Sequence, residues 1–190
     1  MSTIKAVNIQ HPSAASPNLV LNADGSVTGG GVIVAVKHAL FTGTQTNSTA
    51  SLANFAVTDL SITHALADAS NKLIISAYFG AVAQSDQKGQ AGIAVADDGT
   101  LIGLGDAAGN RARVGAGGRT SGNSSVEVVA YPSVYFVYEP GDTSSHTYTV
   151  RAINMSGSTR TVYINRSESD ADFAQNPRAS SGLVIQEVKV

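Results

Sequence analysis

The chain has 190 residues, and its 12 Lys and Arg residues against 14 Asp and Glu residues give a formal net charge of −2. This balance lacks the basic footprint of a nucleic-acid-binding protein, and the length fits one folded domain with a sizeable core. Only 14% of the residues are charged, while 43% are hydrophobic. A surface so poor in charge indicates a protein that buries part of its surface in an assembly.

Cysteine is absent from the sequence, which excludes disulfides, thiolate metal sites and a cysteine nucleophile. The opening residues, MSTIK, lack the apolar stretch of a secretory signal, and apolar runs such as Val32–Val36 are too short to cross a bilayer. We therefore expect synthesis in a cytoplasm, no membrane insertion, and transport outside a cell only as part of a particle.

Residues 1–30 contain too few apolar side chains to build a core of their own. Their short apolar stretches are separated by turn residues, with Asn22–Gly25 typical of a hairpin turn and Gly29–Gly31 typical of a hinge. Such a segment is either a disordered tail or a set of strands that pair with another chain, and its β-rich spacing favours pairing in an assembly. The sequence therefore divides into an N-terminal anchoring segment, residues 1–30, and a head domain, residues 31–190.

From Val32 onward, short stretches rich in Val, Ile, Tyr and Thr alternate with clusters of Gly, Pro, Ser, Asp and Asn, as in successive antiparallel strands. Helical periodicity never lasts three turns, although Ala65–Asn71 has room for one turn. The fold class predicted is all-β, an antiparallel β-sandwich. The predicted strands are Val32–His38, Leu52–Val57, Leu60–His64, Lys72–Val82, Gly92–Ala96, Thr100–Leu104, Val126–Tyr131, Val134–Tyr138, His146–Asn154, Thr161–Asn165 and Leu183–Val190. Gly92–Ala96 and Thr100–Leu104 are expected to form a hairpin about Asp97, Asp98 and Gly99.

Two features of this pattern bear on assembly. The stretch Leu73–Phe79 is apolar on both faces, which predicts a central strand. Because each sheet of a sandwich buries only one face in the core, the second apolar face predicts burial between subunits. The long loop Gly105–Ser125 has no apolar periodicity, and such loops are usually functional or packed on a neighbour.

Several stretches carry a resemblance to a known class of proteins. STIKAVNIQHPSAAS and NLVLNADG, within residues 2–25, resemble the start of tail-fibre and other virion structural proteins of marine and freshwater tailed bacteriophages, especially cyanophages. LGDAAGNRAR, TYTVRA, VYINR and ASSGLVIQEV, within residues 104–188, look like the C-terminal β domain of the same proteins. The resemblance implies a jelly-roll-like head that tends to trimerise. The long repetitive stem of a typical fibre is missing before Val32.

Arg111, Arg113 and Arg119 form a basic cluster in the long loop. Guanidinium groups suit bidentate contacts with carboxylates and phosphates. Since Asp97, Asp98 and Asp106 are close in sequence, one interpretation is an ion-paired loop, within the domain or at a subunit seam. The other is a surface that recognises an anionic glycan.

A second loop, Arg166–Ser180, contains Asp170, Asp172 and Arg178. Its acidic residues alternate as the first ligands of a calcium loop do, but the sixth position is Phe173 and no Glu closes the loop. This excludes an EF-hand and leaves a solvated loop or an irregular calcium site. Because loops at the end of a sandwich away from the anchor are free to vary, both loops are candidates for host contact.

Other motifs give weaker hypotheses. Gly103, Gly105 and Ala108 match the spacing of a dinucleotide fingerprint, but no helical pattern follows them. Glu127 and Glu139 are a conceivable glycosidase pair, yet the chain has no Trp for a sugar platform. No histidine has an acidic companion at metal spacing in the sequence. The histidines, expected at strand edges or interfaces, are His11, His38, His64 and His146.

These observations predict a virion structural protein rather than an enzyme, without cofactor, metal or nucleic acid. Its expected partners are two further copies of itself, in a homotrimer, and other virion proteins reached through residues 1–30. A short fibre or knob and a capsid decoration protein are both compatible with the sequence. The alternative is a module that binds a host-surface carbohydrate.

Overall fold

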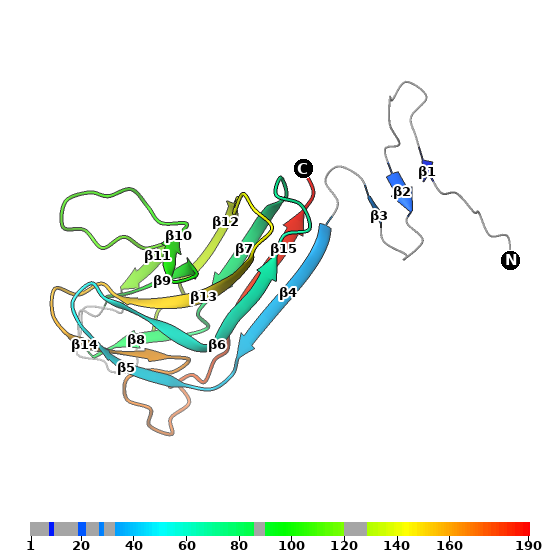
Figure 1. Ribbon diagram of the computed structural model, residues 1–190. Coiled ribbons are helices and arrows are strands. Elements are labelled where there is room, and N and C mark those ends of the chain that lie inside the picture. The colour runs from blue at the N-terminus through cyan, green and yellow to red at the C-terminus, as the bar shows by residue number, and fades with distance from the viewer. Residues whose placement is uncertain (1–7, 10–18, 22–26, 29–32, 86–89, 120–128) are drawn as a thin grey trace, which may run out of the picture.

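The computed structural model describes residues 8–9, 19–21, 27–28, 33–85, 90–119 and 129–190. Every paired strand in these ranges is antiparallel, and the ranges contain no helix, which confirms the all-β class (Figure 1). The strands are β1 (Asn8–Ile9), β2 (Leu19–Leu21), β3 (Val27–Thr28), β4 (Ile33–Phe41), β5 (Gln45–Thr49), β6 (Asn54–Ala65), β7 (Lys72–Tyr78), β8 (Val82–Gln84), β9 (Gln90–Asp97), β10 (Thr100–Ile102), β11 (Ala116–Arg119), β12 (Ser133–Tyr138), β13 (Ser145–Asn154), β14 (Arg160–Ile164) and β15 (Ser181–Val188).

Strands β1, β2 and β3 pair only with one another, in a three-stranded sheet of that order. Figure 1 draws this small sheet beside the sandwich, next to the start of β4. The predicted hairpin turn and glycine hinge lie outside the described residues. The boundary between an anchoring segment and a head therefore stays a prediction.

The first layer of the sandwich has the order β10-β9-β13-β6, and β11 pairs with β9 beyond the end of β10. The predicted hairpin is confirmed: β9 turns into β10 through Asp98 and Gly99, whose φ values of 44° and 88° are typical of a tight hairpin turn. Strand β6 is interrupted by a bulge, because Ala56 and Ser61 face Arg151 and Thr149, which are only two residues apart.

The second layer is one bent sheet. Its upper half has the order β12-β7-β15-β4, and its lower half has the order β8-β14-β5. Strand β4 leads into β5 and β7 leads into β8 across the bend, whereas β14 is joined to β15 by the loop at residues 165–180. When each of these three pairs is counted once and β11 is left out, the two layers together contain eight antiparallel strands.

Asn165 holds the bend. Its side-chain amide donates to the carbonyls of Phe41 and Gly43, both at 2.9 Å, and its Oδ1 accepts from the Ser181 hydroxyl at 2.6 Å. Gly80 allows the backbone to pass closely, since a Cβ there would lie 2.1 Å from the carbonyl oxygen of Ser180. The bend thus depends on one buried amide and one glycine.

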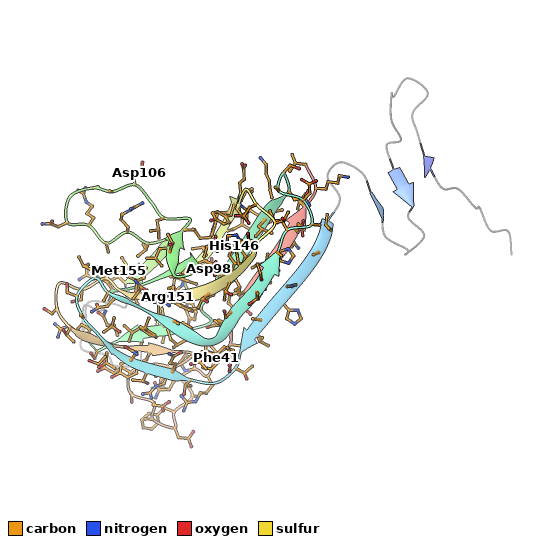
Figure 2. The ribbon with its side chains drawn as sticks, in the orientation of Figure 1. Phe41, Asp98, Asp106, His146, Arg151 and Met155 are labelled. Atoms are coloured by element: carbon orange, nitrogen blue, oxygen red, sulfur yellow. The ribbon has the colours of Figure 1, made fainter. Side chains whose placement is uncertain are left out.

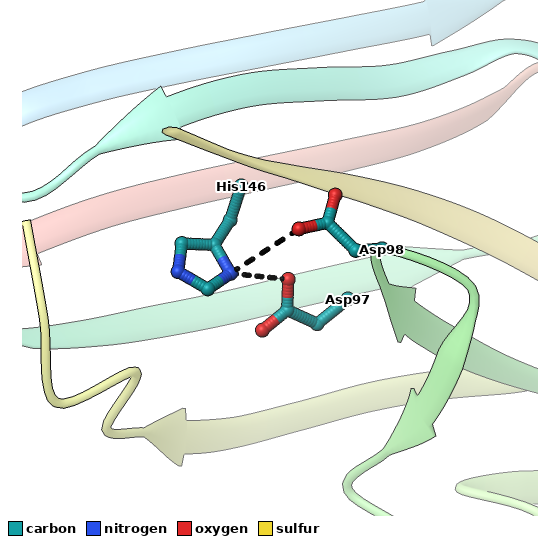
Figure 3. A group of neighbouring side chains, drawn as sticks. All are labelled: Asp97, Asp98 and His146. Carbon is teal, nitrogen blue, oxygen red and sulfur yellow. Dashed lines mark hydrogen bonds and ion pairs between the residues drawn. The ribbon is translucent and has the colours of Figure 1, made fainter. Parts of the chain in front are cut away.

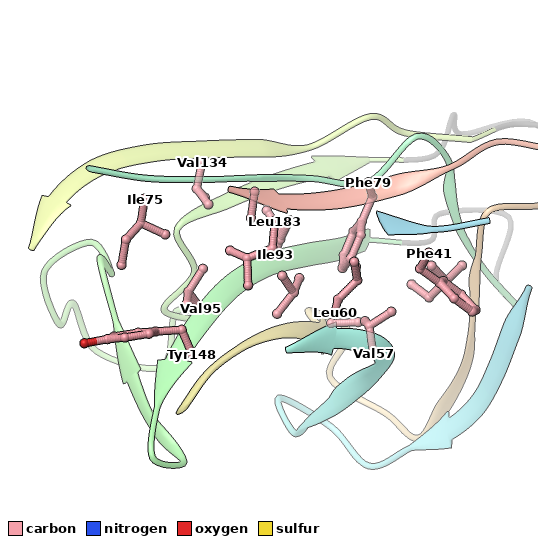
Figure 4. Packing of buried hydrophobic residues seen from close by; sticks show 14 of the residues in the cluster. Phe41, Val57, Leu60, Ile75, Phe79, Ile93, Val95, Val134, Tyr148 and Leu183 are labelled. Carbon is pink, nitrogen blue, oxygen red and sulfur yellow. The ribbon is translucent and has the colours of Figure 1, made fainter. Parts of the chain in front are cut away.

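The core lies between the layers and is built by alternate residues of the facing strands (Figure 4). The rings of Phe79 and Tyr148 are buried in it, and Tyr148 meets Tyr138 edge to face with ring centroids 6.2 Å apart. The fully buried residues from the strands include Leu60, Leu73, Ile75, Ile93, Val95, Val150, Val162, Ile164 and Leu183.

Several predicted strand boundaries are wrong. Leu52–Val57 and Leu60–His64 form one strand, β6, and Lys72–Val82 is divided at the bend into β7 and β8. The prediction missed β5, whose sequence QTNST has no apolar alternation because it lies at an edge of the bent sheet. Where described, Val126–Tyr131 contributes only the isolated bridge of Ala130 to Val82.

The loop predictions also need correction. Gly105–Ser125 contains strand β11, so the uninterrupted loop ends at Gly115. Ala65–Asn71 forms turns and no helical turn. As predicted for the glycine motif, no helix follows Gly103, whose φ of 63° places it in a turn.

Candidate functional site: an exposed apolar sheet face

The outer face of the sheet β12-β7-β15-β4, called here the outer apolar face, carries several exposed apolar side chains. Strand alternation and register place the following side chains on it: Val36, His38 and Leu40 of β4; Ile74, Ser76 and Tyr78 of β7; Tyr135 and Val137 of β12; and Val184, Gln186 and Val188 of β15. The opposite parity of β7 and β15 faces the core, whereas on β4 it includes the exposed Lys37.

The large apolar side chains at the two edges of this face are open to solvent. Tyr135 is 72% exposed, Val36 58%, Val137 55% and Leu40 54%. In the middle of the face, the ring of Tyr78 lies over Gly182, where an added Cβ would be 2.6 Å from the ring. The face therefore presents mainly aliphatic side chains and tyrosine rings, with His38, Ser76 and Gln186 among them.

Charge is nearly absent from this face. Lys72 lies at its rim, opposite Val188, and pairs with Glu139 at 2.7 Å. The other described members of the face include no Asp, Glu, Lys or Arg. An interface of tyrosine and aliphatic residues without charge at its centre is the composition of buried subunit contacts.

The outer face of the other layer is different. Its exposed positions on β6 and β13 carry hydroxyls, which pair across the strands as Ser61 with Thr149 at 3.0 Å and Thr63 with Thr147 at 3.2 Å. Arg151 on the same face donates to Asn54 Oδ1 at 2.8 Å. One face of the sandwich is thus suited to water and the other to an apolar partner.

The structure separates the three arginines that the sequence placed in one cluster. Arg111 and Arg113 lie on the loop between β10 and β11, and Arg119 lies at the end of β11 beside the start of β9. Arg113 donates to the Gly105 carbonyl at 3.0 Å. Within the described part of the chain, none of the three forms an ion pair with a carboxylate, so the ion-paired interpretation finds no partner inside the domain.

The second predicted loop is ion-paired. Asp170 pairs with Arg178 and, at 3.1 Å, with Arg166, and the Arg178 guanidinium lowers the pKa of the Asp170 carboxyl. Asp172 is exposed. Asn165 and Ser181 fix both ends of this loop at the bend, which is the end of β4 away from Ile33. The loop is therefore positioned away from the start of the head, as expected for either role.

An acidic cluster at the opposite end was missed by sequence spacing. His146 Nδ1 lies 2.8 Å from Asp97 Oδ1 and 3.6 Å from Asp98 Oδ2 (Figure 3), and its Nε2 lies 3.1 Å from Asp142 Oδ1. Tyr138 donates to Asp97 Oδ2 at 2.7 Å, and burial together with this bond raises the pKa of Tyr138 to about 12. The cluster supplies its own cation, the imidazolium, so we interpret it as a structural tie between loops.

The contacts of His146 with Asp97 and Asp142 predict a pH dependence of stability. Hydrogen bonds to Asp142 and Asp97 raise the pKa of His146 above its ordinary 6.5. A raised pKa in the folded state gives stability that is complete below pH 6.5 and is lost as pH rises through the folded value. The urea midpoint should therefore fall as the pH rises above about 6.5, and His146→Gln should lessen that fall. An equal fall in both proteins would contradict this role.

A second buried contact was also missed. Glu187 on β15 is buried, and its Oε2 lies 2.9 Å from His64 Nε2 of β6. Its Oε1 accepts from the Ala67 amide at 2.8 Å and from Asn71 Nδ2 at 2.5 Å. The signal in the sequence was the position of Glu187, which shares the parity of the core residues Leu183 and Ile185. An acid on the apolar face of a strand needs a buried partner.

No protein-family model matches this chain, and no curated protein matches its sequence. The described part of the chain has no helix with the length and apolar character needed to cross a membrane.

Proposed function

We propose that this protein is a non-enzymatic structural component of a bacteriophage virion, a homotrimer on the particle surface that is attached through residues 1–30. The single observation that carries the proposal is the outer apolar face, a mainly apolar surface on one sheet. A soluble chain of this kind needs a partner for that surface, and a closed ring of identical copies is the simplest one.

The strand order supports a jelly roll as the finer fold. We number the strands of the two layers 1 to 8 in chain order, counting β4 with β5, β7 with β8 and β14 with β15 as one each and leaving out β11. The first layer then has the order 5-4-7-2, and the second layer has the order 6-3-8-1. Two interleaved four-stranded sheets of this kind are the jelly-roll arrangement of viral capsid and lectin domains. This topology agrees with the resemblance of the sequence to phage virion proteins.

The direction of the chain supports attachment at one end. Strand β4 starts at Ile33 beside Val188, at the end of the sandwich that also carries the His146 cluster (Figure 2). The bend and the loop at residues 165–180 lie toward the other end of β4, beyond Phe41. A head anchored through residues 1–30 would therefore present that loop outward.

The anchoring role predicts the outcome of a truncation. Because the core begins on β4, a chain of residues 31–190 should fold and trimerise as the full chain does, yet be missing from assembled particles. Immunogold labelling of particles from a virus carrying either gene would test this. An unfolded truncated chain would show that residues 1–30 belong to the core, and labelled truncated particles would place the attachment elsewhere.

A second candidate function is recognition of a host-surface carbohydrate. The observation that favours it is a groove at the outward end that is lined by Arg111. Trimerisation would multiply a weak single-site affinity through avidity. Binding of the full chain to a glycan array would test this function, and an array without signal would contradict it.

A further inference from the structure

A shallow groove of about 560 Å³ opens at the end of the sandwich away from the start of β4. It lies between the β5–β6 turn, the start of β9, the loop after β10 and the segment that follows β13. The lining residues are Leu52, Gln90, Asn110, Arg111, Ala112, Met155 and Gly157. Figure 2 places Met155 at the base of the loop whose tip carries Asp106.

The walls of the groove are held by a buried amide network. Asn154 donates through Nδ2 to the carbonyls of Thr49 at 2.8 Å, Ala50 at 3.0 Å and Ser158 at 2.9 Å. Its Oδ1 accepts from Gln84 at 2.6 Å. The Met155 amide also donates to the Gln90 carbonyl at 3.0 Å. Fully satisfied buried networks are rigid, so these walls are formed before any ligand arrives.

The apolar part of the groove is shaped by two glycines and by the backbone conformation of Leu52. A Cβ on Gly117 would lie 2.7 Å from Met155 Sδ, and one on Gly92 would lie 3.1 Å from it, so two glycines make room for this side chain. Leu52 has a φ of 58° and is 46% exposed. A leucine in the left-handed region is strained, and such strain is concentrated at functional sites.

The polar part of the groove offers one cation and two amides. Arg111 is exposed and, among the described residues, forms no ion pair. Its planar guanidinium fork matches a carboxylate. The amides of Asn110 and Gln90 provide both donors and acceptors, as vicinal hydroxyls require.

We propose that this groove binds a saccharide that carries a carboxylate, such as a uronic acid residue. Arg111 pairs with the carboxylate, Asn110 and Gln90 bind hydroxyls, and Leu52 and Met155 contact the apolar face of the sugar ring. The inference rests on the second candidate function and is independent of the subunit interface. An acidic peptide would also pair with Arg111, and its backbone groups would also pair with the two amides, so the test includes an acidic peptide as the competing ligand.

Titration calorimetry of the full chain with hexagalacturonate tests the site. We expect hexagalacturonate to bind at least about tenfold more tightly than maltohexaose or hexaglutamate. Maltohexaose lacks the carboxylate that pairs with Arg111, and hexaglutamate lacks the sugar hydroxyls. Arg111→Ala should weaken binding at least about tenfold. Arg119→Ala removes an exposed arginine that does not line the groove, and it should change the affinity less than about twofold.

Leu52→Gly separates binding from folding. Glycine relieves the positive φ, so the thermal midpoint should hold or rise while the affinity falls. Absence of hexagalacturonate binding, equal binding by Arg111→Ala, or equal binding of hexaglutamate would each overturn the proposal. A glycan-array signal that persists in Arg111→Ala would contradict binding in this groove but would still support recognition of a host carbohydrate. A trimeric mass in the same samples would still support the structural role.

Discussion

Replacing Val36 and Tyr135 together with glutamate should convert the proposed trimer into a monomer. Both side chains are exposed, and they lie on the two edge strands of the outer apolar face, β4 and β12. Burying an unpaired carboxylate costs several kcal/mol, and each subunit of the assembly would lose that amount of association free energy. Size-exclusion chromatography with light scattering should therefore give one third of the wild-type mass.

A matched variant controls for charge alone. Thr63→Glu with Thr149→Glu places two carboxylates on the hydroxyl-bearing outer face of the other layer. This variant should remain trimeric, and circular dichroism should show both variants folded. A trimeric mass for the variant at Val36 and Tyr135 would place the subunit interface on another surface.

Glu187→Ala should destabilise the fold more than any other single change considered. It removes the acceptor for His64, the Ala67 amide and Asn71 in a buried site. Breaking a buried polar cluster by removing one member costs about 3 to 5 kcal/mol, because the remaining groups stay buried without partners. For a chain of this size, the midpoint of thermal unfolding should fall by roughly 10 °C.

Glu139→Ala is the control for this change. Glu139 is an exposed acid that pairs with Lys72 at 2.7 Å, and surface pairs contribute only about 0 to 1 kcal/mol. Glu187→Gln keeps the shape and one acceptor, so its midpoint should lie between those of wild type and Glu187→Ala. Similar midpoints for the two alanine variants would show that the buried cluster does not hold β15 to β6.

Some of the fold was accessible from the sequence because local patterns determine it. The apolar run in β7 predicted a central strand, and β7 does lie between β12 and β15. Asp98 and Gly99 predicted the β9–β10 hairpin through turn chemistry alone. Alternation also predicted the surplus apolar face, since Ile74 and Tyr78 lie on the side of β7 away from the core.

Other features depend on contacts that sequence spacing does not record. The bend of the second layer requires Asn165 to reach Phe41 and Gly43, more than 100 residues away in the chain. The break within β6 comes from a bulge around Asp59, whose φ is 58°, and the pattern on either side was interpreted as two strands. Such tertiary effects override local propensity.

The candidate sites, like the fold, could be predicted only in part from the sequence. Composition predicted Arg111 as a surface group, but the groove beside it is assembled from four separate segments of the chain. His146 meets Asp97 only because β13 pairs with β9, in a register where Tyr148 faces Asp97. A histidine near a hairpin turn gives no sign of this in the sequence.

Sedimentation equilibrium of the wild-type chain at low micromolar concentration tests the central claim most directly. The outer apolar face is exposed in one chain, and its burial between three copies is what the proposed role requires. We predict a single species of three times the 19.4 kDa chain mass, unchanged on tenfold dilution. A species of 19.4 kDa would contradict the proposal of a trimeric virion component.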